Sequence, residues 1–153
     1  MINLQAFNNQ NDMRKSIVDL EHAMKQMHDL RIECEVTHYF APGIYMRQVL
    51  IPKGATVVGK IHKTEHLNIL SQGQLIVWTE DGMKHLKAST VIKSQPGMKR
   101  VGHALSDAVW ITVHHNPSNE QDDDKLEDLL VVDNFEQFKI FMDEQKAISK
   151  EGS

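Results

Sequence analysis

The sequence predicts a single domain with an all-β core, a sandwich or barrel of antiparallel strands, and with helices before and after it. Short β-rich runs separated by turn residues fill the middle of the chain. Apolar residues recur at helical spacing only towards the two ends. A chain of 153 residues is also too short for two full domains. We therefore expect a helical extension over residues 1–34, the barrel over 35–116 and a second helical extension over 117–153.

The composition excludes several classes of protein. Hydrophobic residues make up 41% and charged residues 25%, as in ordinary globular proteins. The apolar runs fall far short of the roughly 20 residues of a membrane span. The N-terminus lacks a basic region followed by an apolar core, so we expect no secretory signal and a cytoplasmic location. Cys34 is the only cysteine, so no internal disulfide is possible.

The charge is unevenly distributed along the chain. Residues 120–153 carry a net charge of −7, whereas residues 1–119 carry +3. These lysines and arginines are scattered, with few aromatic residues between them, and nucleic-acid surfaces are usually more concentrated. Binding to DNA or RNA is therefore not expected, and the acidity belongs to the C-terminal extension.

The first predicted element is a helix that begins near Asn11 or Asp12, both suitable N-cap residues. Its apolar residues alternate at spacings of four and three, which places them in one stripe. The stripe is short for a coiled coil, so we expect it to dock on its own domain, with dimerisation as the alternative. The stripe consists of Met13, Ile17, Leu20, Met24 and Met27.

Eight strands are predicted between residues 35 and 115. Turns rich in proline and glycine separate them, and Asp81-Gly82 is the strongest hairpin signal of the chain. Alternation along residues 44–51 puts Tyr45 and Arg47 on one face, which makes both candidates for a pocket. The expected strands are residues 35–40, 44–51, 56–62, 66–72, 74–79, 83–86, 90–94 and 108–115.

Two helices are predicted after the strands. Asp122 and the two acids behind it can cap a short helix that contains Leu126, Leu129 and Leu130. A second helix should begin at Asp133 or Asn134, where Asp133 and Glu136 resemble a capping box. Its apolar side consists of Phe135, Phe138, Phe141 and Met142. We expect these helices to pack on the barrel or on a second copy of the chain, and a small barrel with open sheet edges favours a homodimer.

Three of the nine histidines are candidates for a metal site. His62 and His66 lie on either side of the turn at residues 63–65, and His103 comes from a distant part of the chain. Imidazoles that converge in this way can hold an ion in an open site. Such ligands suit zinc, nickel, iron or copper better than magnesium or calcium. Spacing alone also allows histidines that are merely exposed or hydrogen-bonded.

The segment from Gly54 to Gly73 resembles the first motif of the cupins, which are small double-stranded β-helix proteins. That motif is Gly, five residues, His, one residue, His, three or four residues, Glu, six residues, Gly, and every interval is reproduced here. His62 matches a usual metal ligand. Lys60 stands where the first His is usual, and His66 stands where the Glu is usual.

The second cupin motif, a Pro-Gly turn followed by a His and later an Asn, is similar to the segment from Pro96-Gly97 to His103, with a slightly longer gap. The resemblance covers about residues 39–116 and implies a jelly-roll barrel in which His103 is the final metal ligand. The sequence segments at residues 40–45, 62–70, 96–100 and 109–114 are also similar to those of short cupin-like proteins of tailed bacteriophages. This resemblance implies no particular reaction.

The departures from the cupin pattern affect the expected chemistry. A protonated Lys60 would repel a divalent cation, so it should turn away from the site or lose its proton. If no metal binds, Lys60, Arg47 and Arg100 form a cationic pocket for an anionic or sugar-like ligand, such as a phosphorylated sugar or a carboxylate. His114 should support the site without being a ligand.

Two functions from different classes remain open. The first is a metal-dependent small-molecule enzyme or binding protein, in which Tyr45, Arg47 and Arg100 orient the ligand. Catalytic residues are unknown, with Tyr45 and Glu65 as candidates, and Glu65 could act as a base only if it points inward. The second is a non-enzymatic interaction protein, for instance a phage-encoded modulator, that binds a protein partner through its helices and acidic tail. The sequence contains no nucleophile motif, phosphate-binding glycine loop or paired carboxylates.

Overall fold

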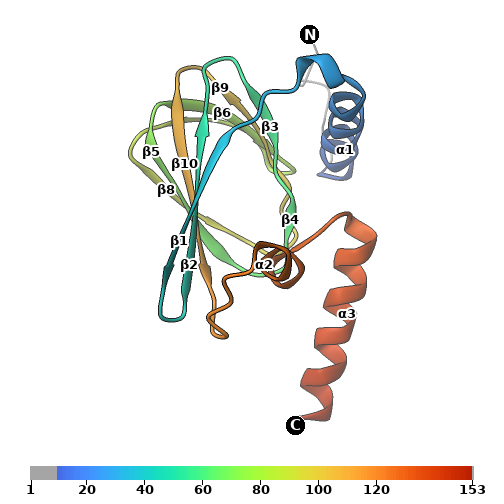
Figure 1. Ribbon diagram of the computed structural model, residues 1–153. Coiled ribbons are helices and arrows are strands. Elements are labelled where there is room, and N and C mark those ends of the chain that lie inside the picture. Colours follow the sequence, from blue (N-terminus) through green and yellow to red (C-terminus); the bar gives the residue numbers. More distant parts are fainter. Residues whose placement is uncertain (1–9, 153) are drawn as a thin grey trace.

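Two antiparallel sheets form the body of the protein in a computed structural model, which describes residues 10–152 (Figure 1). The first sheet has five strands in the order β1 (Glu35–Ala41), β2 (Ile44–Ile51), β10 (Ala108–His115), β5 (His66–Gln72) and β8 (Thr90–Ser94). The second has four strands in the order β3 (Thr56–Val58), β9 (Val101–Ala104), β6 (Gln74–Thr79) and β7 (Gly82–Lys87). The strand order differs from the order in sequence, so several connections cross over between strands that are not neighbours in the chain.

The hydrophobic core lies between the two sheets. Val49, Ile51 and Leu70 come from the five-stranded sheet, and Leu75 and Val77 from the four-stranded sheet; all are buried in one cluster. Each of these side chains follows the alternation of its strand, since successive residues point to opposite faces. The core therefore occupies one part of the barrel interior and leaves the remainder to other side chains.

Two features of the strands differ from the prediction. The expected strand at residues 56–62 is divided into β3 and β4 (Ile61–His62), and between them the N–H of Gly59 donates to the carbonyl of Arg100 at 2.9 Å. The Nζ of Lys99 also donates to the Gly59 carbonyl at 3.0 Å. Strand β9 was not predicted, since it has only four residues and a glycine, which weakens the β signal.

The N-terminal helix α1 (Gln10–Gln26) packs on its own barrel, as predicted, and is followed by the short 3-10 helix η2 (His28–Leu30). Met13 and Ile17 are its buried residues. The carboxylate of Glu21 in α1 forms an ion pair with the buried Lys99 at 3.0 Å. Met27, expected to belong to the apolar stripe, lies beyond the end of the helix and is exposed.

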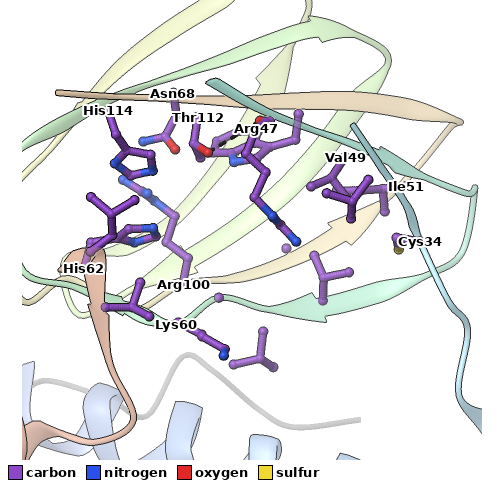
Figure 2. A pocket seen from close by; sticks show the side chains of 18 of the residues that line it. Cys34, Arg47, Val49, Ile51, Lys60, His62, Asn68, Arg100, Thr112 and His114 are labelled. Atoms are coloured by element: carbon purple, nitrogen blue, oxygen red, sulfur yellow. Dashed lines mark hydrogen bonds between the residues drawn. The ribbon is translucent and has the colours of Figure 1, made fainter. Parts of the chain in front are cut away.

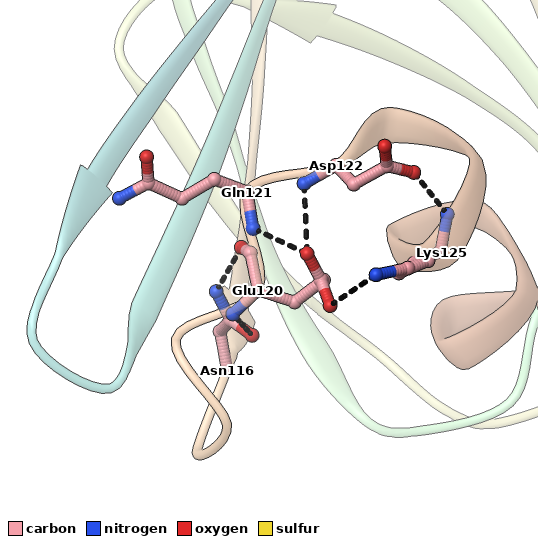
Figure 3. A network of polar contacts seen from close by, with 5 residues as sticks. All are labelled: Asn116, Glu120, Gln121, Asp122 and Lys125. Atoms are coloured by element: carbon pink, nitrogen blue, oxygen red, sulfur yellow. Dashed lines mark hydrogen bonds and ion pairs between the residues drawn. The ribbon is translucent and has the colours of Figure 1, made fainter.

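Helix α2 (Asp123–Leu130) is anchored by a polar network at its N-terminus (Figure 3). Asp122 is the N-cap, and its carboxylate accepts from the Lys125 N–H at 3.0 Å. The buried Asn116 donates to the Glu120 carbonyl at 2.9 Å. The N–H groups of Asp122 and Gln121 donate to the Glu120 carboxylate, which lowers the pKa of that group. The end of β10 and the start of α2 are thereby held in one position.

The chain then adds strand β11 (Val131–Val132), which pairs with β4, before helix α3 (Phe135–Glu151). Asn134, one of the two predicted first residues, caps α3 by accepting from the Gln137 N–H at 2.8 Å. The Gln137 side chain accepts from the Asp133 N–H and not from that of the N-cap, so the capping box predicted for Asp133 and Glu136 does not form. Beyond its first turns α3 extends away from the barrel (Figure 1). None of the helices in the described part of the chain combines the length and the hydrophobicity that a membrane span needs.

Candidate functional site

A cavity of about 670 Å³ lies inside the barrel, beside the core and beneath α2 (Figure 2). Strands β2 and β10 of the five-stranded sheet provide one wall, and α2 provides another through Leu126, Glu127 and Leu130. This volume is within the usual range for small-molecule pockets. The polar side chains that line it are His38, Tyr45, Arg47, Lys60, His62, Asn68, Arg100, Thr112, His114, Asp123 and Glu127.

Three histidines form a cluster at one end of this cavity, and two of them, His62 and His114, line it. The ring centroids of His62 and His66 are 4.2 Å apart, and His114 lies 5.1 Å from His62 and 4.8 Å from His66. His62 ends β4 and His66 begins β5, so the turn between them brings the two rings together. The pairing of β10 with β5 matches Val113 with Leu67, and His114 follows beside His66.

Two of the three rings carry nitrogen atoms without a partner. His66 and His114 are only 5% and 4% exposed. The carbonyl of Thr64 lies 3.0 Å from Nδ1 of His66, so this nitrogen carries the ring proton and Nε2 is left as an acceptor. Among residues 10–152, neither His66 Nε2 nor His114 Nδ1 has a hydrogen-bond partner. Buried polar atoms of this kind usually bind something, which makes the cluster a candidate for ligand contact.

The histidines of the cluster are neutral at neutral pH. Burial lowers the pKa of His62 to about 2, with further lowering by His66, His114 and the nearby arginines. Burial also lowers the pKa of His114 to about 4 and that of His66 below its ordinary value. Desolvation is the main cause in each case, because the interior stabilises an imidazolium poorly.

Two guanidinium groups reach the cavity from different elements. Arg47 projects from β2, and Arg100 follows the Pro96-Gly97 turn; its Nη2 donates to Ser94 and contacts the sulfur of Met98 at 3.3 Å. Burial lowers the pKa of Arg100 from its ordinary value. In the region from residue 10 to residue 152, neither Arg47 nor Arg100 forms an ion pair with a carboxylate. Two carboxylates also line the cavity, but Glu127 pairs with Lys60 and Asp123 lies 3.7 Å from His38. Neither is in ion-pair contact with Arg47 or Arg100.

Several sequence-predicted residues occupy other positions. His103, expected beside His62 and His66, is instead bonded to the Thr56 hydroxyl at 2.8 Å on β9 and does not line the cavity. Arg100, three residues after Gly97, lines the cavity, whereas the predicted His103 does not. Glu65 is half exposed and pairs with Lys93 at 3.6 Å, so it fails the condition for a base, which was to point inward.

The remaining candidates lie at the cavity. Tyr45 is buried, and its hydroxyl lies 2.7 Å from Nδ1 of His38; burial raises the pKa of Tyr45. Its ring stacks on His114 with centroids 5.9 Å apart. Lys60 lines the mouth of the cavity and forms an ion pair with Glu127 of α2, so its charge is directed away from the histidines.

The histidine cluster does not fit a resident divalent metal ion. Neutral imidazoles are suitable ligands in their chemistry. However, no group of three or more His, Cys, Asp or Glu side chains within residues 10–152 has the arrangement of a metal site. The charges of Arg47 and Arg100 already act on His62 and would also repel a cation. The predicted centre of His62, His66 and His103 is therefore not assembled.

His114, expected only to support the site, belongs to the cluster itself, and Asn68 and Thr112 were not predicted as site residues. Alternation along residues 108–115 places His114 on the same face as Thr112, and this is the signal that could have identified both. The Ser94 hydroxyl oxygen accepts hydrogen bonds from both Asn68 and Arg100, so these three residues form one buried chain of polar groups. Only the register between β10 and β5 makes clear that the face with His114 meets the one with His66.

No protein-family model matches the sequence, and a search of curated proteins finds no match. Solved structures do resemble the chain. The plu4264 protein of Photorhabdus luminescens has a TM-score of 0.51 at 10% identity, over 58% of this chain and 80% of its own. KdgF of a Halomonas species has a TM-score of 0.50 at 16% identity, over 63% of this chain and 87% of its own.

A cupin superfamily protein of Desulfitobacterium hafniense has a TM-score of 0.48 at 9% identity, over 54% of this chain and 77% of its own. At such identities the likeness concerns the fold alone. The strand order and the flanking elements confirm the predicted jelly-roll barrel with helices at both ends, and the likeness to the plu4264 protein and KdgF concerns this fold.

Proposed function

We propose that this cupin-fold protein binds a small organic anion inside the barrel. The observation that carries the proposal is the pair Arg47 and Arg100, two cavity-lining guanidinium groups without a carboxylate partner in the described chain. A partly desolvated positive charge is costly unless an anion accompanies it. A bound anion would supply that counter-charge.

The neutral histidines favour the same kind of ligand. Because their pKa values are lowered, His62 and His114 add no positive charge to the cavity at neutral pH and offer hydrogen bonds instead. Arg100 can recognise a carboxylate or a phosphate with paired N–H donors. The arginines would thus hold the charge of the ligand, while the imidazoles contact its other polar atoms.

Isothermal titration calorimetry of the full chain, without a histidine tag, tests the proposal. The probes are the sodium salts of octanoate, gluconate and phosphate, at concentrations up to millimolar. We expect at least one of them to bind with one site per chain. Arg100→Gln should weaken that binding at least about tenfold, because a charge-assisted hydrogen bond is worth this much.

Arg31→Gln is the matched control, since Arg31 is exposed and does not line the cavity. It should bind as the unmodified protein does. If none of the three anions binds, or if Arg100→Gln and Arg31→Gln behave alike, the proposal is wrong. Metal analysis of the same preparation should give substoichiometric zinc, nickel, iron and copper. A full equivalent of one metal that disappears in His62→Asn would restore the metal-site hypothesis.

The alternative of an interaction protein has its own test. A protein partner captured through residues 117–152 should be retained by Arg100→Gln and by His62→Asn, since these residues lie inside the barrel. Apolar side chains of α3 such as Ile140 and Ile148 are exposed in the single chain. If anion binding fails while such a partner is retained, the interaction function is favoured.

A further inference from the structure

The cavity has two chemically different ends, and this difference restricts the ligand beyond its charge. Figure 2 shows His62, Arg100 and His114 at one end and Cys34 and Ile51 at the other, with Arg47 between them. We call the first group the polar end and the side of the cavity around Ile51 the apolar end.

The apolar end is continuous with the hydrophobic core. Val49, Ile51, Leu75 and Val77 line the cavity and belong to the buried core cluster. Trp110 lines it as well and packs against the same cluster. The aliphatic side chains of this wall offer no hydrogen bonds to the hydroxyl groups of a sugar. A polyhydroxylated ligand would lose its water there without compensation.

The size of the cavity also favours a ligand with an apolar part. A volume of about 670 Å³ is much larger than an inorganic anion requires. The polar side chains near His62 and Arg100 occupy only one end, so a ligand that filled the rest would contact mainly aliphatic and aromatic carbon. Burial of such carbon is favourable in proportion to its area.

We propose that the ligand is an amphipathic carboxylate. Its carboxylate group would bind between Arg47 and Arg100, and its aliphatic or aromatic body would occupy the apolar end. This inference rests on the proposed anion binding and adds the chemical class of the anion. Leu126 of α2 is buried and lines the cavity, so α2 would extend the apolar wall over the body of the ligand.

Calorimetry with three probes separates the two requirements. Octanoate has the charge and the apolar body, gluconate has the charge and a hydroxylated body, and octylamine has the apolar body with a positive charge. We expect octanoate to bind at least roughly tenfold more tightly than gluconate, since two buried methylene groups already supply that difference. Octylamine should not bind. The heat capacity change with octanoate should be negative.

Val49→Thr tests the apolar end, because it keeps the shape of the side chain and adds a hydroxyl. We expect it to weaken octanoate roughly tenfold and to leave gluconate unchanged. Val91→Thr is the matched control on the exterior, where Val91 is 63% exposed. If Val49→Thr does not give a folded protein by circular dichroism, Val77→Thr replaces it at the same end of the cavity.

The outcomes distinguish this inference from the proposed function. If gluconate or phosphate binds in an Arg100-dependent manner and octanoate is no tighter, anion binding stands and the amphipathic ligand is refuted. Equal binding of octanoate and octylamine would also refute it, since the arginines would then play no part. If no anion binds at all, both proposals fall.

Discussion

Acidification should destabilise this protein through its buried histidines. The ordinary pKa of histidine is 6.5, whereas the folded chain lowers it to about 2 in His62 and to about 4 in His114. Between these values and 6.5 the unfolded chain binds more protons than the folded one. Stability must therefore fall as the pH falls through this range and is fully present only above it.

The magnitude follows from the width of the pH window. One pH unit of this imbalance corresponds to about 1.4 kcal/mol per group. From about pH 6.5 to about pH 4.5, each histidine should contribute a loss of about 2 kcal/mol, because the unfolded imidazole is already half protonated at the start. The two losses should add within this window, because both rings remain neutral in the folded chain above about pH 4.

Urea unfolding at several pH values within this window measures the effect. His62→Asn and His114→Asn should each retain about 2 kcal/mol of the stability that the unmodified protein loses. The control is His115→Asn, on the exposed neighbour of His114 at the end of the same strand. The reasoning is refuted if the histidine variants lose as much stability on acidification as the unmodified protein, or if His115→Asn has the same effect as His114→Asn.

Three further predictions concern packing and assembly. Gly97→Ala should destabilise the fold by at least about 1 kcal/mol, because Gly97 has a φ of +81° and a Cβ would lie 2.4 Å from the Phe138 ring; Phe138→Leu should recover part of the loss in thermal unfolding. Glu21→Gln should cost roughly 3 kcal/mol in urea unfolding, since it leaves the buried Lys99 without its carboxylate, and an unchanged midpoint would contradict the ion pair. Light scattering should give the mass of two chains, because apolar side chains such as Leu67 remain exposed on the outer sheet face, and the mass of one chain would contradict the homodimer.

Local signals in the sequence were sufficient for most of the fold. The alternation of residues 44–51 and 108–115 and the Asp81-Gly82 turn each correspond to an observed strand or hairpin. Strand β9 escaped because its four residues carry no alternation of their own, and its pairing with β3 and β6 is what stabilises it. Short strands of this kind depend on tertiary contacts that the sequence does not display.

The candidate site was predictable only where its residues are close in sequence. His62 and His66 are separated by one turn, so their proximity followed from spacing. His114 joins them through the register of β10, which no local pattern specifies. Arg100 reaches the cavity in place of the predicted His103 because of the path that the backbone takes after Gly97. There the Arg100 carbonyl accepts from Gly59 before β9 begins. The contribution of α2 to the cavity wall likewise depends on its docking.

The pairing of β11 with β4 links helix α2, which forms one wall of the cavity, to the polar end that contains His62. Val131 lies opposite His62 in this two-stranded sheet, and Val131 directly follows the last residue of α2. A displacement of α2 large enough to widen the entrance would pull on the backbone that carries the His62 ring. If a ligand of the proposed kind entered past α2, the His62 ring would therefore shift with it.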